Sequence, residues 1–126
     1  MTSANGTQII ALEEHNTDSE VAELTGGKGG GSPRQRESQL DLGEARLADL
    51  DAAGIDIQVL SHGPAGAQVL TEDNAADLAV RINDRLKIIR DERPDRFEAL
   101  ALLPAHHPKA AADELERTVG KMGFKG

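Results

Sequence analysis

Three places in the sequence put glutamate or histidine side chains at the end of an apolar run. The run "IIALEEH" ends in Glu13 and His15, "VLSH" ends in His62, and "LLPAHH" ends in His106 and His107. In an extended strand, residues two positions apart point to the same side, so Glu13 and His15 are expected to converge while the residue between them faces away. A carboxylate and an imidazole provide the oxygen and nitrogen ligands that zinc and other divalent metals bind in proteins.

Each of these positions also has a plain structural explanation. The Glu-x-His pair is short and common, so it is also compatible with a solvated acidic turn that contains an incidental histidine. His62 is a weak candidate for contacting a substrate, and the alternative is that "SHGPAG" is a surface turn. His107 directly precedes Pro108 and is expected to occupy the cap position of a helix. Neither His106 nor His107 has the i, i+4 spacing of a helical metal pair.

The elements that must position these residues alternate between strands and helices. Short apolar runs rich in β-branched residues predict strands, and longer stretches with apolar residues every three or four positions predict helices. The expected order is strand 7–12, a polar region over 16–42, helix 42–54, strand 55–61, helix 71–97, strand 97–104 and helix 108–123. The final "FKG" is expected to open a fourth strand.

The apolar spacing within the predicted helices indicates which faces are buried. The helix over 71–97 has an apolar stripe that consists of Ala75, Leu78, Ala79, Ile82, Leu86 and Ile89. Thr71 and Asp73 are candidate N-caps of this helix, and Pro94 forces its end. Gly54 is the expected stop of the helix before it. The face of the last helix that is expected to be buried consists of Leu115, Val119 and Met122.

The alternating order predicts an α/β fold with parallel strands joined by crossover helices. An open doubly wound sheet and a βα barrel both fit this order. The open sheet that binds dinucleotides has a glycine-rich turn after its first strand, whereas "EEHNTD" contains no glycine. All three predicted strands run into polar groups, and in a barrel the carboxyl ends of the strands carry the chemistry.

No domain boundary is visible, so residues 1–126 are expected to form one partial domain. The stretch "TGGKGGGSPRQRES" over 25–38 has no apolar residue, which predicts a flexible loop that adds nothing to the core. It does not match a phosphate-binding loop, because Lys28 is followed by Gly29 instead of serine or threonine.

Composition excludes several classes of function. The formal net charge is −8, with 22 acidic and 14 basic residues, which argues against nucleic-acid binding. No apolar run approaches the roughly 20 residues that a membrane span needs. The sequence has no cysteine, so thiolate metal sites and disulfides are excluded and a cytoplasmic location is expected. Aromatic residues make up 2%, so the core is expected to consist of leucine, isoleucine, valine and alanine.

Five segments, in this order, resemble the amidohydrolase-related family. They are "IIALEEH", "RLADLDAAGIDIQVLS", "AVRINDRL", "RPDRFEALALLP" and "AAADELERTVGKMGFKG". The resemblance is to the branch of metal-dependent hydroxybenzoate decarboxylases typified by γ-resorcylate decarboxylase, with the aminocarboxymuconate-semialdehyde decarboxylases nearby. It extends from residue 9 to residue 126, apart from the glycine-rich stretch.

The resemblance implies a (β/α)₈ barrel of which this chain holds the first three βα units. It also implies that Glu13 and His15 bind a divalent metal, with zinc expected first and manganese as the alternative. The implied reaction is non-oxidative decarboxylation of a small hydroxylated aromatic acid, in an enzyme that can be a homo-oligomer. The metal would bind the carboxylate and the neighbouring hydroxyl of the substrate and would stabilise charge.

The sequence departs from the family in ways that leave other functions open. The family completes its metal site with a histidine and an aspartate from later strands, and eight βα units need on the order of 250 residues. The region after the first strand lacks the aromatic residues that line the family's substrate pocket. The alternatives are a catalytically inactive truncated remnant that associates through its sheet edges, a metal-dependent hydrolase of the same superfamily, and a small α/β binding module without a metal.

Overall fold

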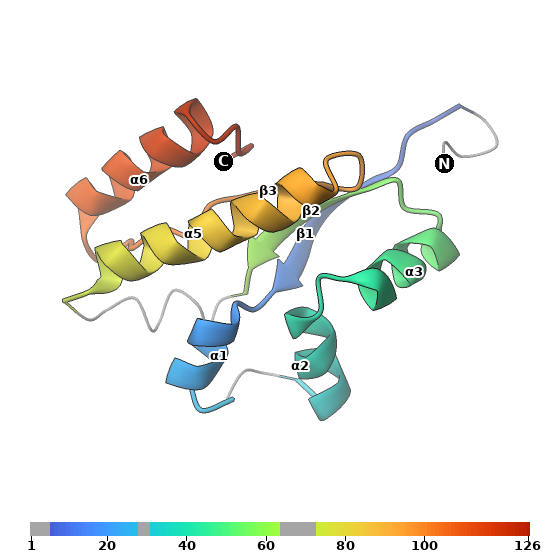
Figure 1. Ribbon diagram of the computed structural model, residues 1–126, viewed down its shortest axis with the longest axis horizontal. Helices are drawn as coiled ribbons and strands as arrows, with labels where there is room; N and C mark the ends of the chain where they lie inside the picture. Colours follow the sequence, from blue (N-terminus) through green and yellow to red (C-terminus); the bar gives the residue numbers. More distant parts are fainter. Residues whose placement is uncertain (1–5, 28–30, 64–72) are drawn as a thin grey trace.

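The computed structural model describes residues 6–27, 31–63 and 73–126, and it shows a parallel sheet with helices packed along it (Figure 1). The strands of the described residues are β1 (Ile10–Asn16), β2 (Ile57–His62) and β3 (Phe97–Ala99), in the order β1-β2-β3. The helices are α1 (Ser19–Leu24), α2 (Pro33–Leu40), α3 (Glu44–Ala53), α5 (Ala75–Glu92) and α6 (Pro108–Gly120). The predicted α/β class with parallel strands and crossover helices is confirmed.

The strand bounds differ from those expected, and the difference matters most for β1. This strand begins at Ile10 and continues to Asn16, so the candidate metal ligands lie inside it instead of after it. Conversely, β3 ends at Ala99, although the N–H of Leu100 still donates to the carbonyl of Leu60 in β2, at 2.9 Å. The turn that follows β1 therefore starts later than the apolar run alone indicates.

β1 contains one more residue than the matching part of β2. Ala11 pairs with Gln58 and Glu14 pairs with Leu60, so three steps along β1 correspond to two along β2. The extra residue is accommodated by Glu13, which has a φ of 58°. A left-handed conformation costs a non-glycine residue about 1–2 kcal/mol. The strict alternation that placed the two candidate ligands on one side of the strand is therefore interrupted at this bulge.

Helix α5 carries much of the core, as its apolar repeat predicts. Its buried apolar residues are Ala75, Leu78, Ala79, Ile82 and Leu86. The helix begins after Asn74, so Asp73 is not its cap, and the other candidate, Thr71, lies outside the described residues. It ends before Pro94, as predicted, because the proline ring disfavours a helical residue before it. Within the described ranges, no helix is both long enough and apolar enough to cross a membrane.

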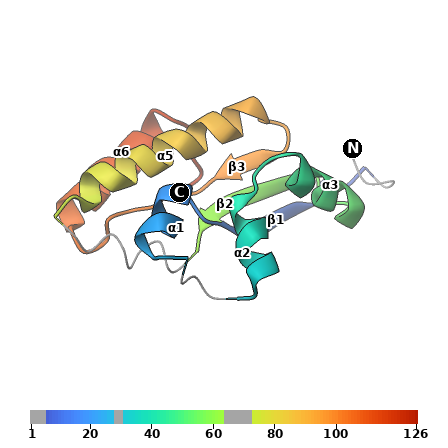
Figure 2. The same ribbon diagram turned by 60° about the horizontal axis from the view of Figure 1, so that its bottom comes forward.

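Figure 2 shows the helices along the sheet. The apolar residues that these elements bury form two clusters. The larger cluster consists of Leu50, Leu60, Leu86, Phe97, Ala99, Met122 and Phe124. Both phenylalanines of the sequence belong to it, so the expectation of a purely aliphatic core is wrong. A second cluster joins Val21 of α1 to α5 and to Leu102. Val21 is the buried residue by which α1 joins the core.

Helix α6 buries a different face from the one expected. Leu115 is 38% exposed and Val119 is 43% exposed, whereas Glu114 and Thr118 are buried at 5% and 0%. Met122 is buried, beyond the end of the helix, as predicted. The apolar residues do not mark the buried face because both buried polar side chains have hydrogen-bond partners, which removes the usual penalty of burying them. Glu114 accepts from Asn83 of α5, and the Thr118 hydroxyl donates to the carbonyl of Glu114 within α6.

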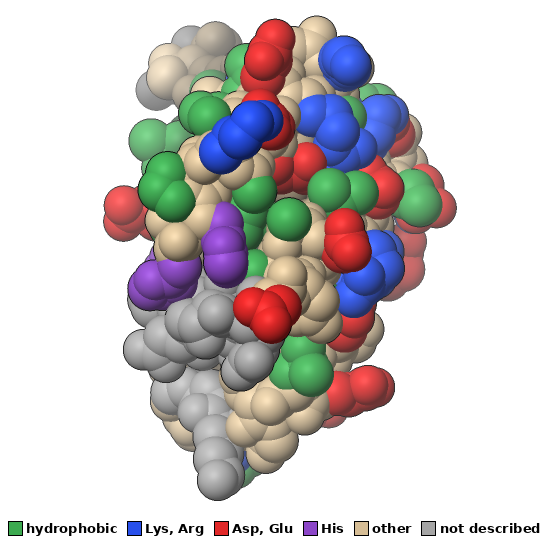
Figure 3. All heavy atoms as spheres, turned by 90° about the vertical axis from the view of Figure 1, so that its left-hand side faces the viewer, with side chains coloured by type: hydrophobic (Ala, Val, Ile, Leu, Met, Phe, Trp, Pro, Cys, Tyr) green, Lys and Arg blue, Asp and Glu red, His purple; other side chains and the backbone are tan. Residues whose placement is uncertain are grey.

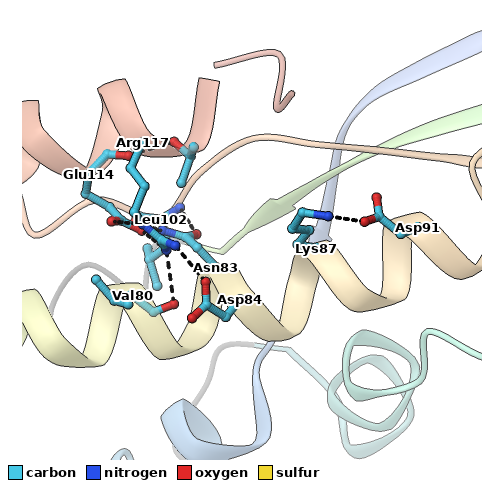
Figure 4. Close-up of polar contacts among 9 residues, drawn as sticks. Val80, Asn83, Asp84, Lys87, Asp91, Leu102, Glu114 and Arg117 are labelled. Carbon is cyan, nitrogen blue, oxygen red and sulfur yellow. Dashed lines mark hydrogen bonds and ion pairs between the residues drawn. The ribbon is translucent and has the colours of Figure 1, made fainter. Parts of the chain in front are cut away.

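The buried polar contacts between α5 and α6 are centred on Asn83 (Figure 4). Its amide nitrogen donates to the carbonyl of Leu102 at 2.9 Å and to Glu114 at 2.8 Å, and its amide oxygen accepts the Leu102 N–H at 2.9 Å. Arg117 donates to Glu114 and to Asp84, each at 2.8 Å, and the Glu114 carboxylate beside it raises the pKa of the arginine. These contacts tie the segment after β3 to both helices.

The predicted flexible loop over 25–38 is wrong for its second half, where α2 forms. Ser32 and Gln35 make a capping box: the serine Oγ accepts the Gln35 N–H at 3.3 Å, and the Gln35 side chain accepts the Ser32 N–H at 2.7 Å. Pro33 occupies the first turn, where its missing N–H costs nothing. Local capping thus creates a helix without an apolar face. No residue of α2 is buried, so this segment adds nothing to the core, as expected.

The last residues bond to the end of β3 and to the segment just after it. The N–H of Lys125 donates to the carbonyl of Ala99 at 2.9 Å, and the N–H of Ala101 donates to the carbonyl of Gly126 at 2.7 Å. Residues 123–126 form no strand in the structure, so the opening of a fourth strand stays a prediction.

Candidate metal centre

The candidate residues of the first two strands lie together at the carboxyl ends of these strands. His15 pairs with Ser61, and Asn16 pairs with His62, so the carboxyl ends of β1 and β2 are level. Figure 3 views the molecule from the side toward which these strands point, and histidine side chains gather on that face. The sheet therefore brings polar residues that are 46 positions apart in the sequence to one place.

His15 is exposed, and its Nδ1 atom lies 3.2 Å from the Oγ atom of Ser61. When the imidazole carries its proton on Nδ1, it donates to Ser61 and its Nε2 atom keeps a lone pair. Metal-binding histidines are held in this way, with the second ring nitrogen bonded to a nearby acceptor that fixes the orientation of the ring. The environment of His15 therefore suits a metal ligand.

Glu14 lies on the opposite face of the sheet from His15. Its Oε2 atom accepts a hydrogen bond from Gln58 Nε2 at 2.9 Å. Gln58 and Ser61 are three positions apart in β2, so their side chains point to opposite faces. Gln58 also contacts Arg46 of α3, which identifies its face as the one covered by helices. The expectation that Glu14 faces away from His15 is confirmed.

Glu13 is exposed and occupies the bulge of β1. Bulges often occur beside active sites, where they redirect a side chain. A carboxylate and an imidazole separated by one residue fit a divalent metal by the chemistry of their donor atoms. Among the residues that the structure describes, no group of three or more metal-binding side chains comes together. Because catalytic zinc sites use three protein ligands, these two residues form at most part of a centre.

His62, the weak candidate for substrate binding, makes a contact that sequence reasoning did not anticipate. It is the last residue of β2, and its Nε2 atom accepts the N–H of Asp18 at 2.9 Å. Burial lowers the pKa of His62, so the imidazole is neutral near pH 7 and can accept this bond. His62 therefore links the end of β2 to the start of α1, and a role in binding substrate stays a prediction.

The start of α1 is also held by a pair of arginines on α5. Asp18 caps α1 by accepting the N–H of Glu20 at 2.9 Å, and its two carboxylate oxygens accept from Arg85 at 2.8 Å each. Glu20 accepts from Arg85 at 2.8 Å and from Arg81 at 2.7 Å, and these bonds lower the pKa of Glu20. The only sequence signal was the i, i+4 spacing of the two arginines, which does not identify a partner.

The two remaining histidines lie at the start of α6. His107 occupies the N-cap position, as expected, but its side chain makes no capping hydrogen bond. His106 is exposed in the turn before it. Neither belongs to a group of metal-binding side chains in the described part of the chain.

Parallel strands joined by helices, with polar residues at the carboxyl ends of the strands, fit the first three βα units of a (β/α)₈ barrel. A sequence profile described as amidohydrolase matches residues 18–126, and the chain belongs to the amidohydrolase family. The matched residues begin just after the two candidate metal ligands, so the assignment of those ligands rests on other observations.

Several curated and solved relatives are named as decarboxylases. A γ-resorcylate decarboxylase from Rhizobium sp. is 38% identical over 120 residues, which cover 93% of this chain and 37% of that protein. The crystal structure of a 2,6-dihydroxybenzoate decarboxylase from Rhizobium has a TM-score of 0.80 and 36% identity, and the match covers 94% of this chain and 36% of that one.

A third relative was crystallised with a metal. The 5-carboxyvanillate decarboxylase from Novosphingobium aromaticivorans, complexed with manganese and 4-hydroxy-3-methoxy-5-nitrobenzoic acid, has a TM-score of 0.85 and 32% identity. The match covers 98% of this chain and 41% of that one. The chain thus spans little more than a third of the length of the relatives that it matches. Over that third, nearly the whole chain has the same fold as the two solved structures.

Proposed function

We propose that this chain forms the first part of a metal-dependent decarboxylase that acts on hydroxylated aromatic acids. The observation that carries the proposal is the position of His15, at the carboxyl edge of the sheet and with Nδ1 bonded to Ser61. Support comes from the relatives, which are named for decarboxylation of dihydroxybenzoate and carboxyvanillate and which include a complex with manganese.

Glu13 and His15 are the residues proposed to hold the metal, and His62 is proposed to border the substrate. The metal is divalent, either zinc or manganese, and when bound it would orient the substrate carboxylate and stabilise developing charge. The chain's own contribution is to hold two ligands at the end of β1 and to place the start of α1 beside them. The lack of cysteine suits a reducing compartment, so we propose a cytoplasmic location.

The further ligands must come from other parts of the enzyme. Two protein ligands are fewer than the three that catalytic zinc sites use. We therefore expect a polypeptide of residues 1–126, by itself, to show no turnover of a hydroxybenzoate. Metal-dependent release of CO₂ by this purified polypeptide would contradict that expectation.

A chimera tests the proposal directly. Residues 1–126 would replace the matching segment of the Rhizobium γ-resorcylate decarboxylase, and CO₂ release from γ-resorcylate would be measured with added manganese. We expect metal-dependent decarboxylation, and we expect Glu13→Gln and His15→Ala to abolish both activity and bound metal. A folded chimera whose metal content is unaffected by these two substitutions would refute the proposed ligands.

The matched controls are the exposed residues Glu116 on α6 and His106 in the turn before it. Glu116→Gln and His106→Ala remove the same chemical groups away from β1, so both variants should retain metal and activity. A chimera that hydrolyses an aromatic amide or ester but releases no CO₂ would favour the hydrolase alternative, since the same kind of metal site can activate water.

A further inference from the structure

Arg46 of α3 contacts the strand that carries the candidate metal ligands. Its Nη2 atom donates to the backbone carbonyl of His15 at 3.1 Å, and its Nη1 atom donates to the carbonyl of Ser38 in α2 at 3.2 Å. Its Nε atom donates to the side-chain oxygen of Gln58 in β2 at 2.6 Å. One guanidinium group thus joins β1, α2, α3 and β2.

The contact with Gln58 connects Arg46 to a second residue of β1. Gln58 is 5% exposed, and its Nε2 atom donates to the carboxylate of Glu14 at 2.9 Å. Arg46 therefore binds the backbone of His15 directly and the side chain of Glu14 through Gln58. These are the two residues that follow Glu13, so the chain is held immediately after the bulge.

The end of β1 needs such support because of the conformation of Glu13. Glu13 has a φ of 58°, and a residue in this conformation persists only when its surroundings hold it there.

Arginine suits this position better than lysine would. Its planar guanidinium presents several donors in fixed directions, whereas an ammonium group is a compact charge on a flexible stem. Here the three donor atoms reach three different acceptors, two of which are backbone carbonyls. The guanidinium group therefore holds β1, β2 and α2 in fixed positions relative to α3.

We propose that Arg46 is a positioning residue for the metal-binding end of β1, because it holds His15 and Glu14 and thereby keeps Glu13 in its left-handed conformation. This inference rests on the proposed function, in that Glu13 and His15 are taken as the metal ligands. Arg46 itself lies on the helix-covered face and acts through its bonds to the His15 carbonyl and to Gln58, not as a ligand.

The first test uses the metal-free chain. Amide hydrogen exchange, measured by NMR, would compare wild type with Arg46→Met and with the control Arg93→Met. Arg93 is 47% exposed and bonds Glu44 of α3, so its loss removes a surface contact of the same helix. We expect Arg46→Met to speed exchange at Glu14, His15 and Asn16 by about tenfold relative to α5 amides, and Arg93→Met to leave it unchanged.

The second test uses the chimera described above, which supplies the remaining ligands, and follows the paramagnetic broadening of the His15 ring signals when manganese is added. We expect Arg46→Met to weaken the apparent manganese affinity by about tenfold, as for other residues that orient a ligand. If wild type shows no broadening at His15, the proposed metal role is refuted, while the exchange data still decide whether Arg46 positions the strand.

Unchanged exchange at residues 14–16 in a folded Arg46→Met variant would overturn the proposal. If Arg46→Met does not fold, Arg46→Lys replaces it, because lysine keeps the charge and most of the stem but cannot reach three acceptors. The proposal then requires faster exchange at the same residues in Arg46→Lys, and protection equal to wild type would refute it.

Discussion

The Nδ1 atom of His15 and the Oγ atom of Ser61 lie 3.2 Å apart across the first two strands of the sheet. We expect Ser61→Ala to weaken manganese binding by about tenfold, since an outer residue that orients a histidine ligand typically contributes that much. Ser61→Thr keeps the hydroxyl and should bind manganese as wild type does. Both affinities are measured in the chimera, by manganese titration followed by electron paramagnetic resonance. Equal values for wild type and Ser61→Ala would exclude an orienting role.

The carboxylate of Asp18 both caps α1 and binds Arg85 of α5. Asp18→Ala should lower the free energy of unfolding by about 1–2 kcal/mol, because a lost N-cap alone costs that much. Urea unfolding followed by circular dichroism gives the value. Asp113→Ala is the control: this aspartate is 62% exposed and pairs with Lys109, so its loss should cost less than about 0.5 kcal/mol.

The imidazole of His62 should make the stability of the metal-free chain depend on pH. Burial lowers its pKa in the folded chain below the ordinary value of 6.5, so between these two values the unfolded state binds more protons. The free energy of unfolding must therefore fall as the pH drops from about 7.5 to about 5.5. His62→Gln, whose side-chain oxygen can still accept the Asp18 N–H, should show a smaller fall. Urea titrations of both proteins at the two pH values measure this fall. If His62 were not responsible, wild type and His62→Gln would lose the same free energy of unfolding.

The buried amide of Asn83 is the best place to test the packing of α5 against α6. Asn83→Ala removes both side-chain bonds to the backbone of Leu102 and one of the bonds to Glu114, which keeps those from Arg117. The loss of the buried Leu102 partners should cost about 2–3 kcal/mol of unfolding free energy. Asn74→Ala serves as the comparison, because Asn74 is exposed and its side chain makes no capping bond. Chemical denaturation should show little change for that variant, and equal losses in the two would argue against a structural role for the network.

Some elements could be predicted well because their signals are local. The apolar repeat of α5 and the proline after it were sufficient to predict its buried face and its end. The short β-branched runs were sufficient for the strands and their parallel order. The prediction is wrong at α6, because the apolar spacing does not show that Glu114 is bonded by Asn83 of α5 or that the Thr118 hydroxyl donates to a carbonyl of its own helix.

The glycine-rich region shows the opposite kind of error. Its glycines predicted a loop, although Ser32, Pro33 and Gln35 together form a standard helix start. The information was present in the sequence, and a capping analysis of residues 32–35 would have predicted the beginning of α2. What it would not have predicted is that α2 lies close enough to α3 for Ser38 to accept a bond from Arg46.

The sequence by itself predicted the class of fold, the alternation of strands and helices from α3 onward and the family resemblance. It also indicated Glu13 and His15 as metal ligands, and that role stays a prediction. These depend on residue types and on spacings of a few positions, which act locally. Only the tertiary structure decided that Glu13 occupies a bulge, that Ser61 bonds His15 and that Arg46 holds the strand end. Those features join residues 31 to 46 positions apart, and no local pattern encodes which distant side chain will arrive beside them.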